Sequence, residues 1–294
     1  MGLPSKKKFF SFQPMLAHAV TSRLIPPDFP SGSVWLVGAG PGDPGLLTLH
    51  AASALNRADV ILYDALVAPE ILALAGPDAR LECAGKRAGR PGRSQLALNE
   101  KLIALARQGL RVVRLKGGDP LVFGRGGEEA LALAAAGIPF HILPGISAGI
   151  GATASAAIPL THRGLAEAAI FVTGRDRTGE LTADLDWVAI AHAAPVIVLY
   201  MARGRIGTIA ASLITAGRDP AEPVAFLSDA TTPRQKIRRA TLATAGDLAA
   251  GIPNGDPTLI VIGPTVGLSD LLRPLHASAP MRLVPPPQAR AAGA

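Results

Sequence analysis

Cysteine is nearly absent from this chain of 294 residues, in which Cys83 is the single example. One thiol cannot close an internal disulfide or supply a cluster of cysteine ligands for a metal. Histidine and cysteine also lack the spacing of a zinc site, so we predict that the protein holds no metal. A chain that needs no disulfide suits a reducing compartment, and we expect a cytoplasmic location.

Aromatic residues are scarce as well, at 4% of the sequence. Proteins that bind single strands of nucleic acid stack the bases on aromatic side chains, so this composition argues against such a function. The formal net charge of +7 favours an anionic partner, such as nucleic acid, a membrane surface or a polycarboxylate substrate, or only maintains solubility. No apolar run is long enough to span a bilayer. We therefore expect neither a nucleic acid nor a membrane as partner.

The two ends of the sequence lack the patterns of a folded domain. The basic run Lys6–Lys8 precedes Phe9, but Gln13 and Pro14 interrupt the apolar core that a signal peptide requires. We expect residues 1–32 to be a flexible extension. Proline and alanine dominate the other end, and we expect residues 277–294 to be a flexible tail.

Aliphatic residues and glycine are abundant, with 49% hydrophobic residues and 32 glycines. Short apolar runs alternate with helical segments, which predicts an α/β protein with a mainly parallel sheet. The expected strands are 34–37, 60–63, 111–116, 140–143, 169–173, 196–201, 224–227 and 259–262. The expected helices are 46–56, 94–109, 128–136 and 206–216. The length allows two domains, and we predict α/β domains over 33–155 and 165–270 with a crossover at 156–164.

The glycine-rich loop 38–44 follows the first expected strand. A dinucleotide-binding loop has a third glycine where this sequence has Asp43. Pro41 also removes an amide that a phosphate would use. A dinucleotide site is therefore disfavoured, and a tight turn between a strand and a helix is the favoured explanation of this loop taken alone.

Two further loops rich in glycine and proline, 116–120 and 144–148, follow two other expected strands. Ligands of open α/β sheets bind beyond the carboxyl ends of strands. Glycine lets a ligand approach the backbone closely, and Asp119 can accept a hydrogen bond from a ribose or an amine. Each loop taken alone is also explained as an ordinary turn.

Together these motifs resemble the uroporphyrinogen-III C-methyltransferases, which belong to the tetrapyrrole methylase family. The matching runs are VGAGPGDP at 37–44, YD at 63–64, GKR at 85–87, VRLKGGDP at 113–120, FGRGGEE at 123–129, PGIS at 144–147, IPLTHRG at 158–164 and TTP at 231–233. The resemblance covers about residues 34–268. It implies the tetrapyrrole methylase fold, in which two α/β domains hold the active site in the cleft between them, and a homodimer.

The resemblance also implies an activity and a set of site residues. The expected reaction transfers two methyl groups from S-adenosylmethionine to two pyrrole carbons of uroporphyrinogen III, giving precorrin-2 for cobalamin or sirohaem biosynthesis. Asp64 corresponds to the family's proton acceptor and Lys86 to its proton donor. The implied contacts of the methyl donor are Pro41, Gly117, Gly118, Asp119, Val122, Ser147, Ala148, Met201, Ala230 and Thr258.

The residue types suit this chemistry. A sulfonium already activates its methyl group, so the protein must orient a carbon nucleophile rather than supply one. The methylated ring then loses a proton, which a carboxylate such as Asp64 can accept. Arginine recognises carboxylates, and we expect Arg125 and Arg163 to bind the substrate. Asp64 as an ordinary turn residue and Lys86 as a solvated charge or a partner of a substrate carboxylate stay open.

Three other functions remain as alternatives. The first is a related methylase that acts on a later corrinoid, on RNA or on a protein. The second is an NAD-dependent dehydrogenase, against which Asp43 argues. The third is a nucleic-acid-binding module, against which the scarcity of aromatic residues argues.

Overall fold

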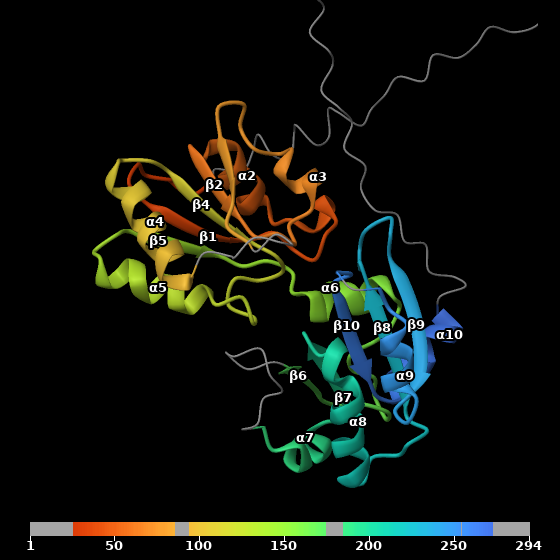
Figure 1. Ribbon diagram of the computed structural model, residues 1–294. Coiled ribbons are helices and arrows are strands. Elements are labelled where there is room, and N and C mark those ends of the chain that lie inside the picture. Colours follow the sequence, from red (N-terminus) through yellow and green to blue (C-terminus); the bar gives the residue numbers. More distant parts are fainter. Residues whose placement is uncertain (1–25, 86–93, 175–184, 254, 273–294) are drawn as a thin grey trace, which may run out of the picture.

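The computed structural model describes residues 26–85, 94–174, 185–253 and 255–272 (Figure 1). The predicted tail 277–294 and residues 1–25 of the predicted extension lie outside these ranges. Residues 26–32 are described, and Phe29 is buried there, with its ring stacked on Trp35 at a centroid distance of 4.3 Å. Packing of the chain thus begins a few residues before the first strand.

The first sheet has five parallel strands in the order β3-β2-β4-β1-β5. Their bounds are β1 Val34–Gly38, β2 Val60–Tyr63, β3 Arg80–Cys83, β4 Val112–Lys116 and β5 Phe140–Leu143. Strands β1 and β4 are buried at every position, which explains the continuous apolar run of β1. Because all five strands run in the same direction, their carboxyl ends meet at one edge of the sheet.

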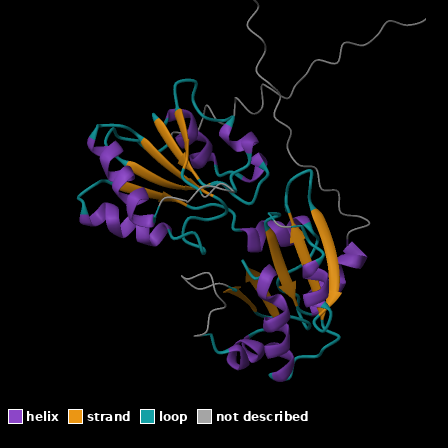
Figure 2. Ribbon diagram, in the orientation of Figure 1, coloured by secondary structure: helices purple, strands orange, loops and turns teal. Residues whose placement is uncertain are grey.

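Helices cover both faces of the first sheet, as Figure 2 shows. Their bounds are η1 Pro44–Leu46, α2 Leu49–Arg57, α3 Pro69–Leu72, α4 Gln95–Arg107 and α5 Gly126–Ala135. Helices α2 and α3 pack on one face around Trp35 and Ile61, and α4 and α5 pack on the other around Leu36 and Leu62. Thr48 and Ser94 cap the first turns of α2 and α4 with their hydroxyl oxygens.

The second sheet is mixed, in the order β6-β7-β10-β8-β9. Its strands are β6 Ala169–Thr173, β7 Val196–Tyr200, β8 Pro223–Ser228, β9 Lys236–Thr241 and β10 Thr258–Ile262. Strands β6 and β7 are parallel, and the other three pairings are antiparallel. The prediction of a mainly parallel sheet is therefore wrong for this part of the chain. Strand β9 follows β8 directly, and such a short connection joins antiparallel neighbours.

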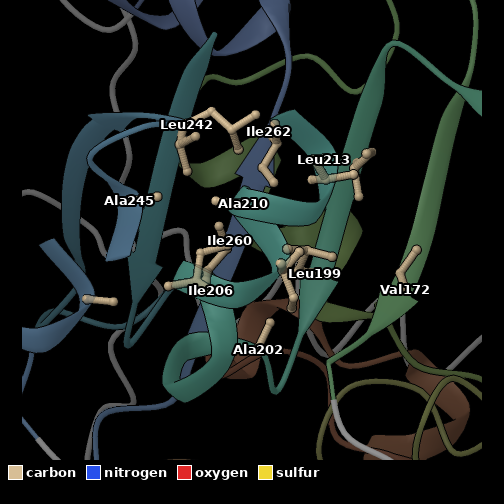
Figure 3. Close-up of a cluster of buried hydrophobic side chains, with 14 of the residues drawn as sticks. Val172, Leu199, Ala202, Ile206, Ala210, Leu213, Leu242, Ala245, Ile260 and Ile262 are labelled. Carbon is tan, nitrogen blue, oxygen red and sulfur yellow. The ribbon is translucent and has the colours of Figure 1, made fainter. Parts of the chain in front are cut away.

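One face of the second sheet packs on three helices around an aliphatic cluster (Figure 3). Leu199 and Ile260 of the sheet meet Ile206 and Leu213 in this cluster. The helices are α7 Trp187–Ala193, α8 Ile206–Thr215 and α9 Ala245–Ala250, and the shorter turns are η2 Arg203–Arg205, η3 Pro264–Leu268 and α10 Ser269–Leu272.

Helix α6, Ala148–Ser155, connects the two sheets. It follows β5 of the first sheet, and its Ala152 packs against Val198 and Val261 of the second sheet. Below, "first half" and "second half" mean the parts built around the first and the second sheet, joined by α6. The domain limits predicted above stay a prediction. None of the helices in the described part of the chain combines the length and apolarity needed to cross a membrane.

Candidate functional site

The three glycine loops of the first half meet at the carboxyl edge of its sheet. Gly40 and Gly118 exchange two backbone hydrogen bonds of 3.1 and 2.8 Å. A Cβ atom added to Gly38 would lie 2.5 Å from the Cα atom of Gly145, a distance that real Cβ atoms do not adopt. These positions therefore require glycine because backbone packs directly on backbone.

Two aspartates hold these loops in place. Oδ1 of Asp43 accepts a hydrogen bond of 2.7 Å from the Gly45 amide at the start of η1, so this carboxylate caps a helical turn. Asp119 accepts hydrogen bonds from the amides of Leu121, at 2.8 Å, and Gly145, at 3.1 Å. Both oxygens of Asp119 thus bind backbone, whereas the sequence suggested a role toward a ribose or an amine.

A cavity of about 730 Å³ lies between the two halves. This volume falls within the range of small-molecule sites. The first half contributes Pro41 and residues 65–69, helix α6 contributes Ala148 and Ala152, and the second half supplies most of the remaining wall. The predicted donor contacts that line the cavity are Pro41, Ala148, Met201, Ala230 and Thr258.

The other five predicted donor contacts, all of them described, are not part of the cavity wall. They are Gly117, Gly118, Asp119, Val122 and Ser147. Ser147 directly precedes Ala148 of the wall, and its hydroxyl is 2.6 Å from that of Tyr200, which also lines the cavity. The structure therefore brings half of the predicted set together at the cavity wall, and the other half does not line the cavity.

The second half presents strained backbone at the cavity. Met201 and Asp229 line it with φ angles of 54° and 47°, in the left-handed region that side chains rarely adopt. Thr231, at φ 64°, accepts a hydrogen bond of 3.1 Å from the Asp43 amide of the first half. Such strain is found where surrounding contacts fix a functional geometry.

Asp64 follows β2 directly before the cavity wall at residues 65–69, and buried cations hold its carboxylate. The Arg114 guanidinium donates a hydrogen bond to Oδ1, and Nζ of Lys116 lies 3.9 Å from Oδ2. Both cations also reach Oε1 of Glu129, each at 3.1 Å. The side chains of Arg114, Lys116 and Glu129 are 4%, 2% and 0% exposed. This network fixes the orientation of Asp64.

The Lys116 ammonium has an unfavourable position for a charge. Burial lowers its pKa, and the neighbouring charge of Arg114 lowers it further, against the opposing effects of Glu129 and Asp64. Arg114, Lys116 and Glu129 are not among the site residues that the sequence predicted. The one signal was the alternation of basic and apolar residues in the strand VVRLK, which places both cations on one face.

The remaining predicted residues lie away from the cavity or outside the described residues. Lys86 belongs to the second group. Arg125 begins α5 with φ 60°, is 56% exposed, and pairs with Glu128 at 2.7 Å. This hydrogen bond raises the pKa of Arg125. Arg163 is exposed in the turn between His162 and Ala166. Substrate binding by Arg125 and Arg163 stays a prediction.

No three His, Cys, Asp or Glu side chains lie close enough to bind a metal together in the part of the chain that the structure describes. Hydrogen-bond donors and acceptors at the cavity come from Tyr200, Arg203, Asp229, Thr232, Arg234, Asp256 and Thr258. With its apolar wall at Leu66 and Val67, such a cavity suits an organic molecule with both apolar and polar parts.

The chain is similar to known methylases over most of its length. The sequence profile of the Tetrapyrrole (Corrin/Porphyrin) Methylases matches residues 33–246. The uroporphyrinogen-III C-methyltransferase of a Sinorhizobium species is 54% identical over 242 residues, which are 82% of this chain and 86% of that protein. A siroheme synthase of Neisseria meningitidis serogroup C is 48% identical over 261 residues, 88% of this chain. This chain spans 53% of that longer protein.

A solved structure extends the similarity to three dimensions. Uroporphyrin-III C-methyl transferase from Thermus thermophilus, complexed with S-adenosylhomocysteine, matches with a TM-score of 0.70 and 40% identity. The match covers 80% of this chain and 99% of that chain. It confirms the predicted fold of two α/β parts.

Proposed function

Because the chain belongs to the tetrapyrrole methylase family, we propose that it transfers two methyl groups from S-adenosylmethionine to two pyrrole carbons of uroporphyrinogen III. The product is precorrin-2, the precursor of cobalamin and sirohaem. One observation carries the proposal: five residues expected to contact the methyl donor line one cavity between the halves, although up to 217 positions separate them in sequence, from Pro41 to Thr258.

The cavity fits the methyl donor. Its volume of about 730 Å³ accommodates a nucleoside joined to an amino acid, and its wall offers both apolar surface and polar groups. Pro41, Ala148, Met201, Ala230 and Thr258 would hold the donor directly, and the loops at 117–122 and Ser147 would support it. When bound, S-adenosylmethionine supplies a methyl group that its sulfonium makes electrophilic.

The protein's own residues orient the substrate and manage the proton. Asp64 lies next to the cavity wall and would accept the proton that the cationic ring system loses after the methyl group is added. Arg114 and Lys116 keep its carboxylate in one orientation, which a positioned base requires. Lys86 is proposed to return a proton to the macrocycle, and Arg125 and Arg163 to bind substrate carboxylates.

The test is an anaerobic incubation of the protein with S-adenosylmethionine and fresh uroporphyrinogen III, followed by mass spectrometry of the tetrapyrrole. We expect a gain of two methyl groups. In the Asp64→Asn variant, we expect kcat to fall roughly 100-fold or more, while the affinity for S-adenosylhomocysteine stays the same. Binding of S-adenosylhomocysteine without methylation of uroporphyrinogen III would indicate that the substrate is instead a later corrinoid, RNA or a protein.

We propose further that the protein is a cytoplasmic homodimer. The family resemblance supports the dimer, and the single cysteine supports a reducing compartment. Sedimentation equilibrium of the full chain tests the oligomeric state. Limited proteolysis tests the proposed domain limits 33–155 and 165–270, because cleavage between compact domains is favoured over cleavage within them.

A further inference from the structure

Tyr200 occupies the junction between the two halves. It is the last residue of β7 in the second half, and it lines the cavity. Its hydroxyl oxygen accepts a hydrogen bond of 2.6 Å from the amide of Gly149 and lies 2.6 Å from the hydroxyl of Ser147. Both partners belong to the first turn of α6, so one phenol oxygen joins the second sheet to the helix that leaves the first.

The phenol replaces the cap that α6 lacks. Ser147 is the N-cap residue of this helix, but its side chain accepts no hydrogen bond from the first-turn amides. Those amides need an acceptor, and Tyr200 supplies one to Gly149 from a distant part of the chain. A Cβ atom added to Gly149 would lie 2.5 Å from the Tyr200 hydroxyl oxygen. Glycine at this position is what allows the phenol to reach the helix.

Two other aromatic rings fix the plane of the phenol. The ring of Phe123 lies 4.8 Å from that of Tyr200, and the ring of Phe171 lies 5.8 Å away, both tilted by about 53°. Phe123 belongs to the loop that follows Asp119 and has a left-handed φ of 52°. Tyr200 therefore joins three segments: the 119–123 loop, the start of α6 and the end of β7, to which it belongs.

The same three segments carry predicted contacts of the methyl donor. Asp119 and Val122 lie on the first, Ser147 and Ala148 on the second, and Met201 directly after Tyr200 on the third. Ala148 of α6 and Met201 of the second half both line the cavity. Their separation depends on what joins α6 to the end of β7.

We propose that Tyr200 is a positioning residue for the methyl donor, which sets the distance between Ala148 and Met201 by binding the first turn of α6. This inference rests on the proposed function. Loss of the phenol oxygen would leave the Gly149 amide without its acceptor and allow the two walls to separate. A site that must be ordered on binding has lower affinity than a preorganised one.

The experiment measures binding of S-adenosylhomocysteine to the full chain by titration calorimetry. In Tyr200→Phe, which keeps the ring and removes only the hydroxyl, we expect Kd to rise about tenfold, the effect of losing one oriented network of hydrogen bonds. The KM for S-adenosylmethionine should rise by a similar factor, and kcat at saturating donor should change little. A purely structural role would lower stability and the active fraction but leave Kd and KM unchanged.

Two further variants complete the test. Ser33→Ala removes a buried hydroxyl that donates to the Pro30 carbonyl at 2.6 Å, at the opposite end of β1, and should leave Kd unchanged. Gly149→Ala displaces the phenol by steric overlap and should raise Kd as Tyr200→Phe does, which keeps the test available if Tyr200→Phe does not fold.

The outcomes separate the two proposals. A Kd in Tyr200→Phe and Gly149→Ala equal to that of the unchanged protein overturns the inference and leaves the proposed function intact. Weaker binding in both variants, with no methylation of uroporphyrinogen III by the unchanged protein, supports the inference and overturns the proposed substrate. Absence of binding by the unchanged protein overturns both.

Discussion

Glu129 shows how much a single buried residue contributes to the site. Its Oε1 atom receives hydrogen bonds from Gln95, Arg114 and Lys116, and its Oε2 atom is buried without a hydrogen bond from any described residue. Removing one member of a buried ion pair leaves an uncompensated charge, which costs far more than losing a surface pair. Without Glu129, Arg114 and Lys116 would have Asp64 as their single carboxylate partner among the described residues.

We therefore expect Glu129→Gln to lower the free energy of unfolding by about 3 kcal/mol, measured by urea denaturation. The adjacent Glu128 offers a matched control, because its pair with Arg125 is more than half exposed on both sides. Glu128→Gln should change the free energy of unfolding by less than about 1 kcal/mol. If the free energy of unfolding changed as little in Glu129→Gln as in Glu128→Gln, the buried network would add no stability.

Tyr200 gives a second prediction for a single residue. Burial raises the pKa of its phenol above the ordinary value of 10.0, against the lowering effect of its hydrogen bonds with Ser147 and Gly149. The neutral phenol is thus favoured in the folded protein. Its contribution to the free energy of unfolding is complete below pH 10.0 and is lost as the pH rises through the folded-state pKa.

The titration can be followed directly, because the chain has only two tyrosines. In a Tyr63→Phe background, the ultraviolet absorbance of tyrosinate reports Tyr200 alone. We expect a midpoint above pH 10.0 in buffer and a return to about 10.0 in concentrated urea. A midpoint in buffer that does not exceed the midpoint in urea would show that the phenol is solvated.

The residues of the site differed in how far sequence could reveal them. The resemblance supplied Pro41 within a recognisable motif, and Met201 and Thr258 by their places at the ends of expected strands. Arg114 and Asp64 are 50 positions apart, and no local pattern predicts that parallel pairing of β2 with β4 brings them together. Tyr200 was only one residue of the expected strand 196–201, because its partners lie 51 and 53 positions away.

At the scale of elements, contacts between loops decide which glycines are needed. Gly38 ends β1, and an added Cβ would meet the backbone of Gly145 at 2.5 Å. Neither loop can move without breaking the sheet edge, so we expect Gly38→Ala to lower the free energy of unfolding by at least about 2 kcal/mol. Urea denaturation measures the change.

Gly127 is the matched control for this exchange. It lies in the first turn of α5, where an added Cβ meets nothing within 4 Å and φ is not positive. Gly127→Ala should leave the stability unchanged or raise it by up to about 1 kcal/mol, since alanine favours helix. A Gly38→Ala variant as stable as Gly127→Ala would mean that the glycine loops tolerate side chains.

The elements themselves were predictable where the sequence is apolar or well capped. All eight expected strands and all four expected helices are present in the structure. Strands β3 and β9, with sequences RLEC and KIRRAT, were missed because edge strands carry exposed charges instead of apolar runs. Helix α6 was missed because AGIGATAS consists mostly of small residues with weak periodicity.

The sequence could not show whether neighbouring strands pair in parallel or antiparallel, and the reason is physical. A strand that is buried on both faces reads as a continuous apolar run whether its neighbours are parallel or antiparallel. Strands β8 and β10 are of this kind. Their antiparallel pairing depends on how the intervening residues 229–257 return, and that path is fixed by contacts across the sheet.

For the whole molecule, the position of the cavity between the halves links ligand binding to stability. A ligand that contacts Pro41 of the first half and Met201 and Thr258 of the second half binds only when both halves are folded. It therefore stabilises the protein by mass action. At 100 times its Kd, S-adenosylhomocysteine should raise the free energy of unfolding by about 2.7 kcal/mol, measured by urea denaturation with and without the ligand.

NAD⁺ is the matched comparison, because it shares the adenosine group and tests the alternative use of the glycine loop. Asp43 occupies the position of the third glycine and caps η1 with its carboxylate, where a pyrophosphate would meet a negative charge. We expect NAD⁺ at the same concentration to leave the free energy of unfolding unchanged. Stabilisation by NAD⁺ but not by S-adenosylhomocysteine would mean that the cavity is a dinucleotide site. Stabilisation by S-adenosylhomocysteine alone would mean that the two halves together bind the methyl donor.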